Sequence, residues 1–113
     1  PYTALDGGKL GIQIGSNCSI SSGVNIIGHD SVKWALSGGK MPHEYGKIVI
    51  GNNCFVGTNA MITKGVIVGN HCLIGANAVV TKSCPDFSII LGIPGKICGK
   101  VLKKGDEIEL QYF

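Results

Sequence analysis

Aliphatic side chains return at every sixth position through the middle of the chain. The series is Ile50, Val56, Ile62, Val68, Ile74 and Val80. Four positions after each of them stands a small apolar residue: Cys54, Ala60, Val66, Cys72, Ala78 and Cys84. The same register fits an earlier stretch, at Ile14, Cys18, Ile20, Val24 and Ile26. A helix buries residues with a period of 3.6 and a strand with a period of 2, so neither alone explains a period of six.

Short strands joined by tight turns explain this period if each hexapeptide forms one side of a coil, as in β-helices. The turns agree, because the fourth position of the hexapeptide carries residues that tolerate a positive φ. These residues are Asn17, Gly23, Asn53, Asn59, Gly65, His71 and Asn77. Inward β-branched residues also suit stacked strands. The pattern therefore predicts an all-β fold, a short parallel β-helix of hexapeptide repeats.

The length and the limits of the repeat predict a single domain over residues 1–113. Regular coils are expected over about residues 11–29 and 48–92, with an excursion loop at 30–47 and a C-terminal cap at 97–113. The pattern does not decide whether the cap is a strand or a helix. So short a repeat array has exposed ends and little buried area, which favours oligomerisation.

Composition narrows the class of protein. There are 18 glycines, and the formal net charge is +3, too small for a nucleic-acid-binding surface. No apolar run approaches the ~20 residues of a membrane span, and the N-terminal stretch lacks the features of a signal peptide. The five cysteines include no CxxC pair, which fits neither a disulfide framework nor a zinc ribbon. We expect a cytoplasmic protein whose cysteines are mostly small core residues.

The repeat is interrupted from Gly28 to Lys47, where the only tryptophan and two of the three histidines lie. Repeat proteins place insertions as loops on one face, which is often the binding face. His29 opens the interruption, and a neutral imidazole there can act as a general base. Its register also fits a simple turn residue. Asp30 follows directly and is a candidate to orient the imidazole.

The other two histidines have simpler interpretations. His71 occupies a turn position of an unbroken repeat, and His43 lies in the middle of the loop, where it contacts either substrate or solvent. A catalytic zinc site needs three protein ligands. The three histidines include no closely spaced pair, so we expect no metal.

The stretch from Ile48, IVIGNNCFVGTNAMITKGVIVGNHCLIGANAVVTKSCPDFSIILGIPGKICGKV, resembles the C-terminal half of the hexapeptide-repeat acetyltransferases. The resemblance covers roughly residues 11–101. Its markers are the hexapeptides, the VVTK that ends the last regular coil, and GIPGK, which matches the family's G-x-P-[AG]-[KR]. The chain looks most similar to sugar O-acetyltransferases of the galactoside, maltose and surface-polysaccharide type.

The resemblance implies a left-handed parallel β-helix and a homotrimer with active sites between neighbouring subunits. It implies that acetyl-CoA is the donor substrate and lies along the coils. His29, in IIGHDS, matches the histidine that acts as the family's general base. The base would remove a proton from an acceptor hydroxyl, whose oxygen then attacks the thioester carbonyl.

The resemblance also implies which residues bind the donor. Thr58 matches a position near the oxyanion of the tetrahedral intermediate, and Ala76 matches a backbone contact to the pantetheine arm. Thr81 and Lys82 match a pair near the later part of the cofactor. Lys96 matches a basic residue near the nucleotide phosphates.

Two positions depart from the family pattern. The tryptophan common in NVWIG is Phe55 here, which keeps the apolar contact and loses an indole N–H. A second basic residue expected near the C-terminus falls on Gly99, with Lys100 next to it. We therefore expect weaker phosphate binding, or binding shared with Lys103 or Lys104.

We predict an acyltransferase that moves an acetyl group from acetyl-CoA to a hydroxyl of a sugar or polysaccharide precursor. The excursion loop is expected to form the acceptor wall, with Asp30, Trp34, His43 and Tyr45 contacting the substrate. The same base and thioester also suit N-acetylation of an amino sugar, or acetylation of serine or an antibiotic. A non-catalytic trimeric scaffold is an alternative of a different class, which predicts no acetyl-CoA binding and a dispensable His29.

Overall fold

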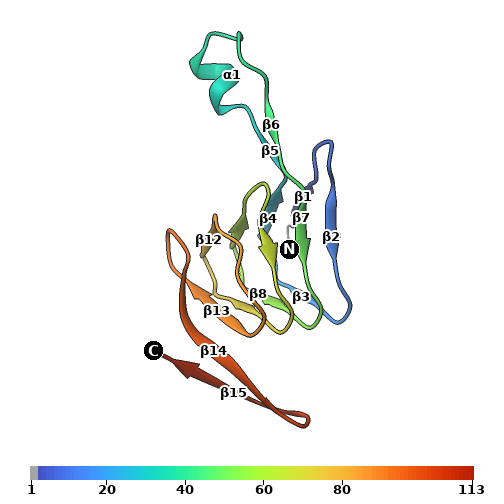
Figure 1. Cartoon of the computed structure of the whole chain (residues 1–113), viewed down its shortest axis with the longest axis vertical. Helices are drawn as coiled ribbons and strands as arrows, with labels where there is room; N and C mark the ends of the chain where they lie inside the picture. The colour runs from blue at the N-terminus through green and yellow to red at the C-terminus, as the bar shows by residue number, and fades with distance from the viewer. Residues whose placement is uncertain (1–2) are drawn as a thin grey trace.

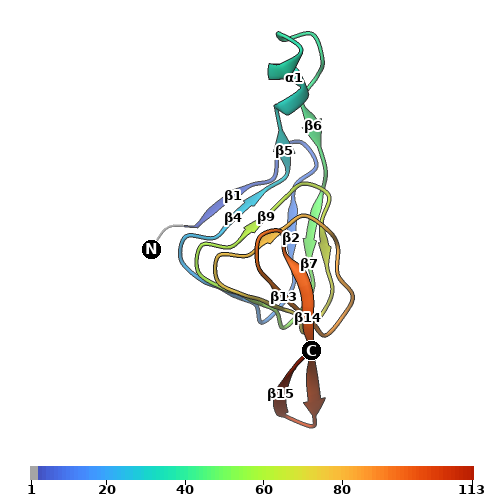
Figure 2. The same cartoon turned by 90° about the vertical axis from the view of Figure 1, so that its left-hand side faces the viewer.

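The chain winds through three sheets in succession, one hexapeptide per sheet, and then returns to the first (Figures 1 and 2). This computed structural model describes residues 3–113. The first sheet contains β1 (Ala4–Asp6), β4 (Asn25–Ile27), β9 (Met61–Ile62) and β12 (Val79–Val80). The second contains β2 (Ile12–Ile14), β7 (Ile48–Ile50) and β10 (Ile67–Val68). The third contains β3 (Ser19–Ile20), β8 (Phe55–Val56), β11 (Leu73–Ile74), β13 (Ser88–Leu91), β14 (Lys96–Lys104) and β15 (Glu107–Tyr112).

Each complete turn of the coil is 18 residues long. Parallel pairing places Ile50 beside Val68, Val56 beside Ile74, and Ile62 beside Val80, so stacked partners differ by 18 positions. Ile14 instead pairs with Ile50, which is 36 positions later, because the excursion loop adds 18 residues to that turn. The parallel strands and the period of three hexapeptides confirm the expected β-helix.

The inward positions predicted from the repeat form the core. The six aliphatic residues from Ile50 to Val80 are each at most 1% exposed, and the small apolar residues between them at most 6%. Ile14, Cys18 and Ile20 are only partly buried and pack against this core. They are less covered because β2 and β3 are edge strands of their sheets, whereas β4 is covered by β1.

The turns have the backbone conformation that the sequence predicts. All seven fourth-position residues have a positive φ, from 54° to 79°. His71 is one of them, with a φ of 54°, so its interpretation as a turn residue is confirmed. His29 lies in a β-strand instead, so the turn interpretation of that residue is wrong.

Polar side chains of the turns between the second and third sheets join each coil to the next. Asn52 Oδ1 accepts the Ser16 N–H at 2.8 Å, and Asn70 Oδ1 accepts the Asn52 N–H at 2.7 Å. Asp86 Oδ1 accepts the Asn70 N–H at 2.8 Å. These bonds form a ladder, which we call the turn ladder, and they occupy backbone donors that the sheets leave free.

The excursion loop leaves the coil as an antiparallel pair of short strands, β5 (His29–Asp30) and β6 (Glu44–Tyr45). A short helix, α1 (Val32–Leu36), closes its outer end, and Figures 1 and 2 show it standing clear of the coils. None of the residues of α1 is buried. The helix begins just after Asp30, whose Oδ1 accepts the Val32 N–H at 3.0 Å.

The C-terminal residues leave the coil as strands, which answers the question left open by the sequence. β14 runs antiparallel to β13, and β15 folds back antiparallel on β14. The whole of β15 is exposed. Across residues 3–113, no helix is both long and apolar enough to cross a membrane.

Candidate active site

The base of the excursion loop brings His29, Asp30 and Tyr45 together. His29 and Tyr45 are opposite each other in the β5–β6 pair, with ring centroids 6.1 Å apart. The His29 side chain is 31% exposed, so the imidazole is partly shielded and still open to a ligand. Its Nε2 lies 2.9 Å from Oδ2 of Asp6, at the end of β1.

Asp30 points to a different partner. Its carboxylate forms an ion pair with Lys64, in the turn after β9 of the next coil. Lys64 also lies 3.5 Å from the carboxylate of Glu44, which pairs in turn with Lys33 at 3.2 Å. Hydrogen bonding from Lys64 lowers the pKa of Asp30, and the same contact raises the pKa of Lys64. This network ties the loop to the coil, and the group bonded to the imidazole is Asp6 rather than Asp30.

The outer part of the loop carries the other two residues expected to contact the acceptor. Trp34 lies on α1 with 46% of its surface exposed. Its ring meets that of His43 edge to face, with centroids 5.5 Å apart. Trp34 and His43 therefore form a small aromatic group beyond the loop base.

The residues expected to bind the donor lie in two places on the coils. Thr58 and Ala76 lie in turns of adjacent coils between the third and first sheets, both exposed. The two turns touch, because the Asn77 N–H donates to the Thr58 carbonyl at 2.9 Å. Thr81, Lys82 and Lys96 line one pocket of about 400 Å³ together with Pro94 and Ile97.

His29 and the Thr58–Ala76 column lie at different corners of the coil. His29 follows β4 and precedes β7, so it lies where the chain passes from the first sheet to the second. Thr58 and Ala76 lie where it passes from the third sheet to the first. Figure 2 views the coil along its axis and shows the triangular outline that separates these corners.

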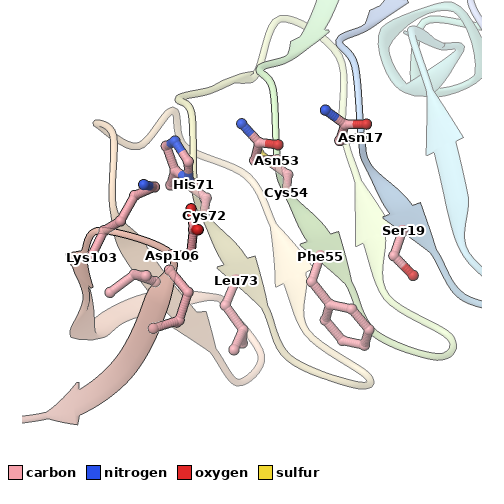
Figure 3. Close-up of a pocket in the computed structure, with 12 residues that line it drawn as sticks. Asn17, Ser19, Asn53, Cys54, Phe55, His71, Cys72, Leu73, Lys103 and Asp106 are labelled. Carbon is pink, nitrogen blue, oxygen red and sulfur yellow. The ribbon is translucent and has the colours of Figure 1, made fainter.

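A second hollow of about 440 Å³ lies between the third sheet and the C-terminal hairpin. Figure 3 shows Asn17, Asn53 and His71 following one another along it, with Lys103 and Asp106 on the hairpin side. Phe55, the residue that replaces the family's tryptophan, faces this hollow. The residues expected to act on substrate are not among those lining it.

The glycine at the second departure from the family pattern has a structural reason. Gly99 is buried in β14 opposite β15. A Cβ there would lie only 2.3 Å from the Gln111 carbonyl oxygen. The hairpin therefore leaves no room for a basic side chain at this position.

Sequence reasoning missed Asp6 and Lys64. Asp6 pairs in register with Ile27, 21 positions later rather than 18, so the hexapeptide count does not align it with the loop base. Lys64 could have been found. Ile26 stacks on Ile62, so the residues two positions further on also stack, and this places Lys64 beside the start of the loop.

Among residues 3–113 no group of three or more histidine, cysteine, aspartate or glutamate side chains is arranged to hold a metal ion. The polar groups at the loop base are already engaged with one another through hydrogen bonds and ion pairs. This arrangement is suited to holding an imidazole, with a neighbouring carboxylate, beside a partly open surface.

Comparison with known proteins agrees with this description. Residues 47–82 match the family described as bacterial transferase hexapeptide (six repeats). Protein CapG of Staphylococcus aureus is 49% identical over 87 residues, which cover 75% of this chain and 50% of CapG. AntD, an N-acyltransferase from Bacillus cereus, has a TM-score of 0.78 and 28% identity. The match covers 91% of this chain and 59% of AntD, which was solved with dTDP-4-amino-4,6-dideoxyglucose and coenzyme A.

A maltose O-acetyltransferase from Clostridium difficile 630 is also similar, with a TM-score of 0.72 at 28% identity. The match covers 82% of this chain and 50% of that enzyme. The fold is thus the left-handed β-helix typical of hexapeptide repeats. The chain belongs to the hexapeptide-repeat transferases, and it spans about half the length of the curated relative that it matches.

Proposed function

We propose that the chain forms the catalytic β-helix of an acyl-CoA-dependent acyltransferase that transfers an acetyl group to a sugar hydroxyl. The observation that carries the proposal is His29, a partly open imidazole that is held by a carboxylate at the base of the excursion loop. The family match and the acyltransferases of known structure support the use of a CoA thioester. The sugar acceptor is supported by the maltose enzyme and by the sugar nucleotide bound to AntD.

In the proposed reaction His29 takes the proton of the acceptor hydroxyl. The oxygen attacks the thioester carbonyl, and a carbon–oxygen bond forms. The tetrahedral oxyanion needs hydrogen-bond donors that are already in place, and Thr58 is our candidate. The carbon–sulfur bond then breaks, and the imidazolium returns its proton to the leaving thiolate.

The donor-binding residues have roles that follow from their positions. Ala76 lies one coil above Thr58 and offers its backbone to an extended ligand. Lys82 and Lys96 share a pocket with Thr81, and their two ammonium groups suit the phosphates of coenzyme A. Asp30, Trp34, His43 and Tyr45 supply the loop side of the acceptor site.

A homotrimer is part of the proposal. His29 and Thr58 lie at different corners of one coil, so a second copy of the chain has to bring a Thr58 corner to a His29 corner. The partly exposed residues of the first coil also favour association. The active site would then form between subunits.

N-acylation of an amino sugar is the second candidate function. The likeness to AntD favours it, because AntD is an N-acyltransferase solved with a 4-amino sugar nucleotide. The chemistry differs only at the attacking atom, since an amine nitrogen replaces the hydroxyl oxygen. Proton removal by His29 serves both acceptors.

Turnover of acetyl-CoA, followed by mass spectrometry, tests both functions. The panel should contain neutral sugars, nucleotide sugars and nucleotide amino sugars, so that product mass and fragmentation distinguish an ester from an amide. His29→Ala should lower kcat by about 10²–10⁴, the usual contribution of a general base. His71→Asn is the matched control, because asparagine occupies the equivalent turn position in other coils. Absence of acetyl-CoA binding, or full activity of His29→Ala, would refute the proposal.

A further inference from the structure

The carboxylate of Asp6 is held rigidly against the ring of His29. Asp6 Oδ2 lies 2.9 Å from His29 Nε2, while Asp6 Oδ1 accepts the Gly8 N–H at 3.1 Å. The Asp6 carbonyl accepts the Gly28 N–H at 2.7 Å, immediately before His29. Both the backbone and the side chain of Asp6 are therefore anchored at the loop base, although the side chain is 57% exposed.

The turn after Asp6 packs closely on the same site. A Cβ placed on Gly8 would lie 3.1 Å from the Tyr45 ring and 3.3 Å from the Cβ of His29. Lys9, the next residue, places its ammonium 4.8 Å from the centroid of the Tyr45 ring. Residues 6–9 thus form one wall around the imidazole, opposite the excursion loop.

This contact determines which nitrogen of the imidazole is available. An ionised carboxylate only accepts hydrogen bonds, and the bond to His29 lowers the pKa of Asp6, so the carboxylate is ionised at neutral pH. The neutral imidazole must therefore carry its proton on Nε2 and donate it to Asp6. The lone pair is then on Nδ1, for which residues 3–113 provide no recorded hydrogen-bond partner.

We propose that Asp6 is a positioning residue, which holds His29 in the Nε2–H tautomer and leaves Nδ1 as the atom that accepts the acceptor's proton. The inference rests on the proposed function of His29 and adds the identity of the basic nitrogen and of its partner. Asp30, although adjacent in sequence, cannot fill this role while its carboxylate is paired with Lys64.

The proton and charge changes balance. The acceptor's proton moves to Nδ1 as its oxygen or nitrogen attacks the thioester carbonyl, and the imidazolium keeps its Nε2–H bond to Asp6. The Asp6 carboxylate stabilises that positive charge without taking a proton itself. The Nδ1 proton then passes to the thiolate that leaves when the carbon–sulfur bond breaks.

The first test is the tautomer, measured by long-range ¹H–¹⁵N NMR on the whole chain at pH 8, with His29 signals assigned by their loss in His29→Gln. We expect the wild type to show a protonated Nε2 and an unprotonated Nδ1. In Asp6→Asn we expect a mixture of tautomers, because the amide can either donate or accept. A wild-type ring protonated on Nδ1, or the same tautomer in Asp6→Asn, would overturn the inference. This measurement does not depend on knowing the acceptor, so it separates the inference from the proposed function.

The second test is kinetic. Asp6→Asn should lower kcat by about 10- to 100-fold, within the range that a general base contributes, while KM for acetyl-CoA changes by less than about twofold. Asp6→Glu should recover part of the lost kcat. Asp86→Asn is the control, because Asn52 and Asn70 fill the same place in the turn ladder. An unchanged or higher kcat in Asp6→Asn would show that the carboxylate does not assist the base.

Discussion

Replacing Gly57 by alanine tests how closely adjacent coils are stacked at the turn that carries Thr58. Gly57 is buried, and a Cβ built on it would lie 2.5 Å from the Ala76 nitrogen and 2.9 Å from the Ala76 Cα. Both are backbone atoms of the next coil, so no side-chain rotation relieves the contact. The coils have to separate instead.

The size of the effect follows from these distances. An ordinary contact of 3.4 Å requires the two coils to move apart locally by 3.4 − 2.5 = 0.9 Å. That movement would stretch the Gly57 N–H···O=C Ile74 bond from 2.8 Å and the Asn77 N–H···O=C Thr58 bond from 2.9 Å beyond hydrogen-bonding range. Two lost bonds cost about 1 kcal/mol each, and forcing atoms into a packed core costs about 1–3 kcal/mol. We expect Gly57→Ala to destabilise the fold by about 3 kcal/mol or more.

Urea unfolding followed by circular dichroism, at one fixed protein concentration, measures this loss. With a denaturant slope of about 1–3 kcal/mol/M, the midpoint should fall by about 1–3 M. Gly65 supplies the controls, because a Cβ there meets nothing within 4 Å and its φ is +79°. Gly65→Ala should lose only about 1–2 kcal/mol through its backbone conformation, and Gly65→Asn should lose less. A Gly57→Ala variant as stable as the wild type would refute the stacking distance described here.

Three further predictions concern charge and burial. Lys64→Met should change the free energy of unfolding by less than about 1 kcal/mol, as is usual for exposed ion pairs, but should speed proteolysis of the excursion loop severalfold; unchanged cleavage would contradict the anchoring role. Of the five thiols, only the two partly buried ones should react quickly with a thiol reagent in the folded protein; Cys84 should stay slow although its pKa is lowered to about 7, because it is 6% exposed. The carboxyl of Asp6 should titrate below its ordinary pKa of 3.8, because the bond to His29 favours the ionised form. The stabilisation is therefore present above that value and lost as the pH falls through the lowered pKa; a midpoint that His29→Gln does not raise would contradict the pairing.

The coiled core could be predicted from the sequence because one local rule repeats in it. Each inward position needs a β-branched or small apolar residue, and each turn needs a residue that tolerates a positive φ. Ile62 and Asn59 follow from that rule without knowledge of distant contacts. The rule is less informative at the end of the stack, where Ile14 and Ile20 have the expected residue type and lack full cover.

The surroundings of His29 could not be predicted in the same way. Its position at the break in the repeat was visible, but its partner comes from β1, where the spacing is 21 residues and the repeat no longer aligns the strands. Nearness in sequence favoured Asp30, and the structure gives that carboxylate to Lys64. The C-terminal hairpin was equally undetermined, because its exposed strands are held by backbone pairing and carry little apolar pattern.

The turn ladder has a consequence for how such a chain can change in length. Each rung joins one coil to the next through the same type of bond, from a side-chain oxygen to a backbone N–H, so every internal rung is equivalent. A duplication or deletion of 18 residues would restore the rungs, the core register and the turn conformations together, whereas one of five or seven would break all three at once. Length in this fold is therefore inherited in whole coils. Evolution can move the excursion loop and the C-terminal hairpin closer together or further apart in fixed steps, without redesigning either.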